Sequence, residues 1–258
     1  GVPILGLQVG FNAKAALASM DLTKAGFPGP KRVFNGEHGY FKLIENDDYD
    51  ISYLQENIGK LWMVNQLAHK PFPSGRLTHG LVHAIKDLKL KHGLNKDDIE
   101  SIECFVPPGV YKLVARPIID NLTTNYSKLC AKFVGASFMI NDHLNIETFT
   151  EKKYLNNKDT LNFAKKITMI KNDKLDQKVL TPQKFIITLV NNSKIEINID
   201  HVYGHPKAPL SEKEYLEKFS KCCFSSTNKI DQNQVNRMLD FIFDLENKDN
   251  VIDFFKTI

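Results

Sequence analysis

The sequence predicts an α+β protein in which a mixed segment interrupts two helical segments. Three observations predict this class: apolar residues recur at helical spacing towards both ends, strand-like alternation is confined to the middle, and 42% hydrophobic with 25% charged residues is typical of a folded globular chain of 258 residues. We expect part of a helical domain over residues 1–65, an inserted α+β domain over 66–202, and the C-terminal return of the chain to the helical domain over 203–258.

The first segment opens with an Ala-rich helix over residues 11–25, which Gly26 ends before a Pro-rich exit. Glycines and aromatic residues over 31–46 indicate a compact loop with one helical turn. Residues 62–67 predict a short strand that leads into residues 70–73, Lys-Pro-Phe-Pro, where two prolines force an extended turn.

The middle segment begins with leucines and an isoleucine at helical spacing over 77–88, and Gly93 closes that amphipathic helix. Residues 102–106 alternate as a half-buried strand does. Residues 126–139 are apolar enough for one buried helix, and the polar residues 156–178 indicate a lysine-rich surface.

The strongest strand signal is a β-hairpin formed by residues 185–190 and 195–199, which Asn191-Asn192-Ser193 connects. In the last segment, Ser211 with Glu214 three residues later predicts a capping box at a helix start. Apolar residues over 235–242 predict the last long helix.

Composition excludes several classes of protein. A net charge of +4, evenly spread, argues against nucleic-acid binding, and no apolar run approaches the roughly 18 residues of a membrane span. Four cysteines without C-x-x-C spacing favour reduced thiols in an intracellular compartment over disulfides or zinc. The chain begins at Gly1 without Met, which suggests that the opening is a cut.

His79 and His83 lie four residues apart on one predicted helix, so both project from the same face, as two metal ligands would. The metalloprotease motif needs Glu directly after the first His, and Gly80 stands there. Ordinary helix histidines are therefore the preferred interpretation, and we expect no metal site.

The turn at Lys70 leads to a helix start, where free backbone N–H groups and the helix dipole can hold a carboxylate. Further donors come from Ser74, Gly75, Arg76 and Thr78. On residue chemistry alone, the simpler alternative is favoured: the prolines steer the chain and Lys70 is solvated. Tyr111, after a strand end, and His205, in a Tyr-Gly-His-Pro turn, could donate protons or hydrogen bonds, or could be structural.

Four stretches then become recognisable together: residues 7–13, residues 26–30, residues 70–79, and Gly204-His205-Pro206 with the following Pro-Leu-Ser and Lys218-Phe219. In this order they resemble the MmgE/PrpD family, which includes 2-methylcitrate dehydratase, cis-aconitate decarboxylase and iminodisuccinate epimerase. Members are about twice as long, so the resemblance implies that the chain corresponds to the C-terminal part.

The resemblance implies an all-helical domain built from both chain ends, incomplete here at its N-terminus, with a smaller α+β lid inserted. It implies a cleft site that uses Lys, His, Asp and Tyr without metal or organic cofactor. Carried over by position, Lys70 and Tyr111 are the catalytic candidates. The substrate-binding candidates are Ser74, Arg76, His79 and His205.

Two departures from the family pattern bear on the reaction. Leu5 and Gln8 stand where decarboxylase-like members have Lys and His, and Gly75 stands where they have another His. The expected activity is therefore that of a lyase or isomerase on a small di- or tricarboxylate, by dehydration of a 2-methylcitrate-like acid or epimerisation of an iminodisuccinate-like acid. Proton abstraction next to a carboxylate is the shared step. The alternative is a non-catalytic fragment or interaction module.

For partners, we expect a homodimer, because a helical domain lacking part of itself should expose apolar surface. We expect neither nucleic acid nor membrane as a partner. The expected location is the cytoplasm, or the mitochondrial matrix in a eukaryote.

Overall fold

The computed structural model describes residues 4–258, apart from the side chain of Leu5. The expectations about Gly1 and about the side chain at position 5 lie outside the described residues. The chain divides into two compact units, one ending at Leu67 and one from Ala68 to Ile258. A joint helical domain of residues 1–65 and 203–258 stays a prediction. No helix among residues 4–258 is long and apolar enough to cross a membrane.

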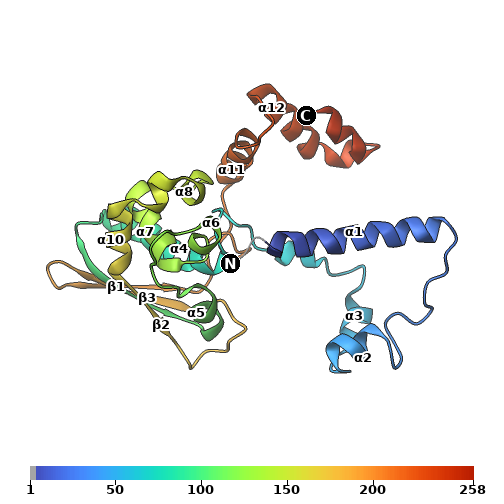
Figure 1. Cartoon of the computed structure of the whole chain (residues 1–258), viewed down its shortest axis with the longest axis horizontal. Coiled ribbons are helices and arrows are strands. Elements are labelled where there is room, and N and C mark those ends of the chain that lie inside the picture. Colours follow the sequence, from blue (N-terminus) through green and yellow to red (C-terminus); the bar gives the residue numbers. More distant parts are fainter. Residues whose placement is uncertain (1–3) are drawn as a thin grey trace. The chain divides into compact units, whose positions relative to one another are not determined.

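The first unit contains α1 (Ile4–Lys24), α2 (Tyr40–Glu45), α3 (Ile51–Asn57) and the 3₁₀ helix η1 (Met63–Gln66) (Figure 1). The expected Ala-rich helix is confirmed, although it begins at Ile4, and Gly26 follows it with a φ of 88°. The single helical turn expected within 31–46 is α2.

The strand expected over 62–67 is wrong, because these residues form η1. A strand needs a neighbour for its backbone groups. Here the N–H groups of Asn65 and Leu67 instead donate to the carbonyls of Trp62 and Val64 within the same segment.

The first unit has almost no core of its own. Among its residues with described burial, Gly39 alone is buried. Phe11, Phe34 and Trp62 are each more than half exposed, at 64%, 61% and 66%. Packing within this unit therefore contributes little apolar burial to its stability.

The second unit is built around a four-stranded sheet of β1 (Ile99–Val106), β2 (Ile167–Lys171), β3 (Gln183–Leu189) and β4 (Lys194–Ile199), in the order β2-β1-β3-β4. β1 is parallel to β2 and antiparallel to β3, and β3 and β4 form the expected hairpin. Asn192, with a φ of 66°, lies in its turn.

The helices of this unit are η2 (Arg76–Thr78), α4 (His79–His92), α5 (Pro108–Val114), α6 (Thr124–Ser127), α7 (Ala131–Asn141), α8 (Glu147–Thr150), α9 (Lys152–Leu155), α10 (Lys158–Lys165), α11 (Glu212–Phe224), α12 (Gln232–Phe243), η3 (Leu245–Asn247) and η4 (Val251–Lys256). In Figure 1, α4, α7 and α10 lie together on one side of the sheet. The helices expected to end at Gly93, to start at Ser211 and to span 235–242 are confirmed as α4, α11 and α12.

One expectation for the middle segment is incomplete and another is wrong. The lysines of the polar stretch 156–178 are exposed, apart from the half-buried Lys166, but the stretch also contains α10 and the edge strand β2, whose Ile167 and Met169 are buried. The single helix over 126–139 is broken at Lys128 into α6 and α7. The break leaves the carbonyl of Lys128 free to accept the N–H of Gly75 at 2.8 Å.

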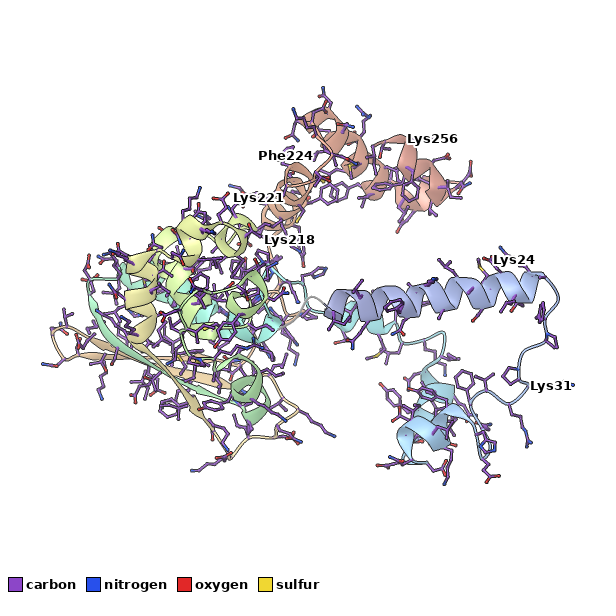
Figure 2. All side chains as sticks on the ribbon, in the orientation of Figure 1. Lys24, Lys31, Lys218, Lys221, Phe224 and Lys256 are labelled. Atoms are coloured by element: carbon purple, nitrogen blue, oxygen red, sulfur yellow. The ribbon has the colours of Figure 1, made fainter. Side chains whose placement is uncertain are left out.

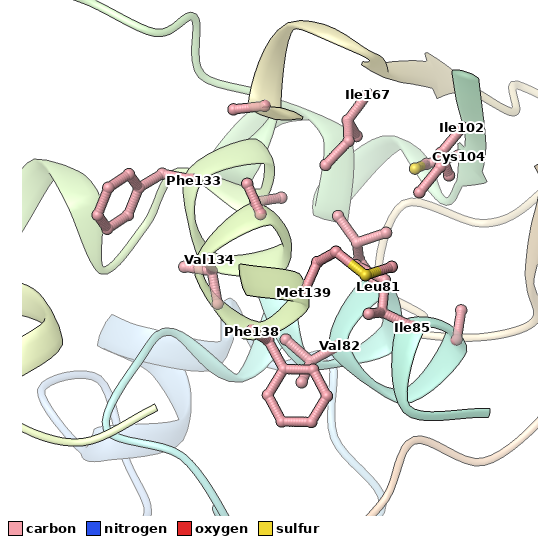
Figure 3. Close-up of a cluster of buried hydrophobic side chains, with 14 of the residues drawn as sticks. Leu81, Val82, Ile85, Ile102, Cys104, Phe133, Val134, Phe138, Met139 and Ile167 are labelled. Atoms are coloured by element: carbon pink, nitrogen blue, oxygen red, sulfur yellow. The ribbon is translucent and has the colours of Figure 1, made fainter. Parts of the chain in front are cut away.

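The core lies between α4, α7 and one face of the sheet. Figure 3 shows side chains of α4 and α7 meeting those of β1 and β2. Gly135 permits close contact between the two helices, because a Cβ there would lie 2.6 Å from Leu81 Cδ2. The α+β class is therefore confirmed, and the role of this unit as a lid stays a prediction.

Candidate functional site

The turn at residues 70–73 precedes η2 and α4. Phe72 anchors the turn, because its ring lies 5.3 Å from that of His79 and 5.7 Å from that of Phe138. Lys70 is exposed and forms no ion pair with a carboxylate of residues 4–258. The turn therefore presents an unpaired cation on a fixed backbone.

A buried chain of hydrogen bonds follows directly behind this turn. The Ser74 and Thr78 hydroxyl oxygens are 3.0 Å apart, and His79 Nε2 lies 3.0 Å from Ser74 Oγ. Thr78 donates to the carbonyl of Gly75 at 2.8 Å. All three side chains are at most 5% exposed. The chain ties the entrance of α4 to the turn.

The direction of each bond follows from counting donors. A hydroxyl has one proton, and Thr78 gives its proton to Gly75, so Ser74 must donate to Thr78. Ser74 then accepts from His79 Nε2–H, which leaves His79 Nδ1 as an acceptor facing Arg76 Nη1 at 3.5 Å. The hydroxyls of Ser74 and Thr78 and the ring N–H of His79 are all engaged within the protein.

His79 is held neutral at this site. Burial first, and then the positive charges of Arg76 and Lys70, lower the pKa of His79 to about 3, while Ser74 opposes the shift and Lys218 adds to it. An imidazole surrounded by three cations and kept uncharged marks a region of positive potential. Such a region favours an anionic ligand.

The same shift predicts a dependence of stability on pH. The folded pKa of His79 lies below the unfolded value of 6.5, so the unfolded chain binds more protons between these values. The stabilisation is complete above about pH 6.5 and is lost as the pH falls, by about 1.4 kcal/mol per pH unit between pH 6 and 4. Urea unfolding across this range should show the slope, and His79→Gln should reduce it. An unchanged slope would contradict a buried neutral His79.

Arg76 fastens the turn region to a second segment, residues 201–208, here called the strap. Its Nη1 donates to the carbonyl of Tyr203 at 2.5 Å and its Nη2 to that of Val202 at 2.9 Å. Its buried Nε has no partner among the described residues. The guanidinium is therefore largely engaged with backbone.

The strap lies directly beside the turn. His69 N–H donates to the carbonyl of Gly204 at 2.8 Å, and the rings of His201 and His205 stack with centroids 4.7 Å apart. His205 is half-buried, and its Nδ1 accepts the N–H of Lys207 at 3.0 Å. Residue 205 is thus brought near the turn by backbone contacts.

The N-terminal part of α11 also packs beside this site. Lys86 on α4 lies 4.2 Å from the centroid of the Tyr203 ring and 3.2 Å from Glu214 Oε1. Burial alone would raise the pKa of Glu214, but hydrogen bonds with Tyr203, Ser211 and Lys86 lower it to about 2. Glu214 is therefore a carboxylate that joins α4, the strap and α11.

Tyr111 follows the end of β1, as expected, lies on α5, and is 37% exposed. Because α5 packs against η2, Tyr111 and Arg76 lie on neighbouring elements. The structure thus brings together Ser74, Arg76, His79 and His205 around the turn that carries Lys70, with Tyr111 on an adjacent helix. Their roles towards a ligand stay predictions.

The two histidines of α4 have separate partners. His79 faces Ser74, whereas His83 Nδ1 accepts the N–H of Tyr203 at 3.3 Å. Among residues 4–258, no group of three or more His, Cys, Asp or Glu is placed to hold a metal ion. Each histidine therefore has a protein partner that accounts for its position.

Two residues near this site, Glu214 and Lys218, were seen in the sequence only as part of a capping box and of the family resemblance, and neither was named as a site residue. Glu214 lies 3.2 Å from Lys86 of α4, and the charge of Lys218 helps to lower the pKa of His79. The capping box at Ser211 marked the start of α11, but nothing local in the sequence indicated that this helix lies beside residue 70.

These features define an α+β unit with a cationic site next to a Lys-Pro-Phe-Pro turn. Residues 72–240 match the MmgE/PrpD C-terminal domain, and the chain belongs to the MmgE/PrpD family. It is similar to the cis-aconitate decarboxylases of Mus musculus, with 24% identity over 229 residues, and of Homo sapiens, with 24% identity over 222 residues. Each match covers 83% of this chain and 44% of the relative, so the chain spans less than half of their length.

Proposed function

We propose that this chain is the C-terminal part of an MmgE/PrpD-type lyase or isomerase that acts on a small di- or tricarboxylate. The reaction is dehydration or epimerisation, begun by removing a proton next to a carboxylate without metal or organic cofactor. The observation that carries the proposal is the unpaired Lys70 on a fixed turn in front of a buried, neutral His79. A cation there would hold a carboxylate and stabilise enolate-like charge as it develops.

Each candidate has a role in this proposal. Lys70 binds a carboxylate, and Tyr111, carried on α5 beside η2, supplies or positions a proton. Arg76 contributes charge from behind the turn, because its Nη atoms are engaged with the strap. Ser74 and His79, with their donors engaged within the protein, keep the turn in place, and His205 lies on the strap at its edge.

Position 75 favours dehydration or epimerisation over decarboxylation. Decarboxylase-like members resemble this chain at the turn but carry a histidine where Gly75 stands. A Cβ at Gly75 would lie 2.6 Å from Leu129 Cδ2, so Leu129 occupies the space that a side chain there would need. The wider expectations, a lid closing over a helical domain, a homodimer and a cytoplasmic or matrix location, belong to the same proposal.

Lys70→Ala in the full-length protein is expected to lower kcat/KM at least about tenfold, the scale for loss of one electrostatic contact. The fold of the variant should stay intact, because the Lys70 side chain is exposed and has no ion-pair partner among residues 4–258. The measurement is turnover of a panel of di- and tricarboxylates, with the midpoint of thermal unfolding recorded for each variant.

Lys207→Ala is the matched control, because it removes an exposed lysine from the strap without touching the turn. Equal rates in the wild type and Lys70→Ala would refute the role of Lys70. Absence of turnover in the wild type with every acid of the panel would favour the alternative, a non-catalytic interaction module.

A further inference from the structure

We infer that Lys218 on α11 is a second ligand-binding cation, which acts with Lys70 so that the site selects acids with more than one carboxylate. The inference rests on the proposed function and adds to it a residue that determines specificity. Lys218-Phe219 is part of the sequence resemblance, but the sequence alone assigned no role to Lys218, which lies 148 positions after Lys70 in the chain.

The placement of Lys218 follows from how α11 is held. The Tyr215 hydroxyl lies 2.9 Å from His69 Nδ1, and the two rings meet edge to face at 4.8 Å. Lys218 is three residues after Tyr215, so both occupy the same side of the helix. Lys70 directly follows His69. The contact between Tyr215 and His69 therefore brings the two lysines to the same region, and Figure 2 shows Lys218 on α11 with Lys221 farther along it.

Lys218 has no carboxylate partner within the described part of the chain, unlike two lysines near the start of α11. Lys213 lies 4.0 Å from Glu217 and Lys86 lies 3.2 Å from Glu214, whereas Lys218 forms no ion pair with any carboxylate of residues 4–258. Lys218 is half-buried, and its ammonium has no carboxylate beside it among the described residues. A carboxylate of a ligand would supply that counter-charge.

The two cations act at one place. The charges of Lys70 and Lys218 both reach the imidazole of His79 and lower its pKa, which locates them around the same buried side chain. An ammonium is a compact point charge with three donors on a flexible stem. Two of them on different elements can each hold one carboxylate of the same acid, and a monocarboxylate can use only one.

The test is calorimetric titration of the full-length protein with citrate, which has three carboxylates, and with propionate, which has one. Lys218→Gln is expected to raise the Kd for citrate about tenfold or more, the scale for loss of one charge-assisted hydrogen bond. The Kd for propionate should change less than about twofold if Lys70 holds its single carboxylate. Thermal unfolding confirms that each variant is folded.

Lys221→Gln is the matched control. It removes the same charge from the same helix, but Lys221 is exposed and lies one turn farther along α11, where it lines a cavity with Leu216 and Phe224. Citrate affinities that are equal in Lys218→Gln and Lys221→Gln would overturn the inference and leave the proposed function intact. Absence of citrate binding to the wild type would overturn both.

Discussion

Gly204→Ala is expected to lower the free energy of unfolding of the second unit by about 2–4 kcal/mol, from left-handed strain plus a steric clash. Gly204 has a φ of 88°, and a Cβ there would lie 2.2 Å from the carbonyl oxygen of His69. The opposing atom belongs to the backbone, so no rotamer change can relieve the contact. For a unit of this size, the midpoint of thermal unfolding should fall by several degrees, about 2–4 °C per kcal/mol. Urea unfolding measures the loss of free energy directly.

Gly93→Ala separates the two causes. Gly93 also has a positive φ, 65°, but a Cβ there meets nothing within 4 Å. It should cost only the strain, on the order of 1 kcal/mol. Similar losses in the two variants would show that the close approach of the strap to His69 adds nothing to the destabilisation.

A second consequence of Gly204→Ala is weaker ligand binding, because its clash displaces the residue that precedes Lys70.

The other large effect is expected for Arg76→Ala, which should destabilise the second unit by about 2–4 kcal/mol, since each hydrogen bond to a charged donor contributes about 1.5–3 kcal/mol. Arg76 is half-buried, and its two Nη atoms satisfy the carbonyls of Val202 and Tyr203. Alanine leaves both carbonyls without that donor. Urea unfolding followed by circular dichroism measures the loss.

Two variants define what Arg76 contributes. Arg76→Lys keeps the charge but cannot reach two carbonyls in parallel, so it should recover only part of the stability. Arg116→Ala is the control: Arg116 donates to the carbonyl of Leu113, three residues earlier, at 3.2 Å and lies 5.2 Å from the centroid of the Tyr126 ring, so its loss should cost at most about 1 kcal/mol. A loss in Arg76→Ala no larger than in Arg116→Ala would contradict a clamp between the turn and the strap.

Elements whose signals are local were predictable from the sequence. The capping box at Ser211 is present as expected, with Ser211 Oγ accepting from Glu214 N–H at 3.4 Å. The hairpin was predictable because both strands alternate and Asn192 can adopt a positive φ between them. The edge strand β2 was not predictable. Only two of its five side chains are buried, and the surrounding lysine-rich sequence hides so short an alternation.

The grouping of site residues close in the chain could also be predicted, since residues 74–79 share one turn and helix start. Their partners could not. Arg76 donates hydrogen bonds to carbonyls that lie 126 and 127 residues later in the chain. His69 forms its hydrogen bond with Tyr215, which lies 146 residues later. Such pairings depend on how α11 and the strap pack against α4, and no local propensity encodes that.

The buried chain from Arg76 through His79, Ser74 and Thr78 to the carbonyl of Gly75 has one polarity from end to end. A proton wire works by passing a proton in at one terminus and out at the other. Here one terminus is a guanidinium, which does not give up its proton in proteins, and the other is a peptide carbonyl, which does not take one. The chain therefore conducts no protons. Any proton removed from a substrate at this site must leave by another route.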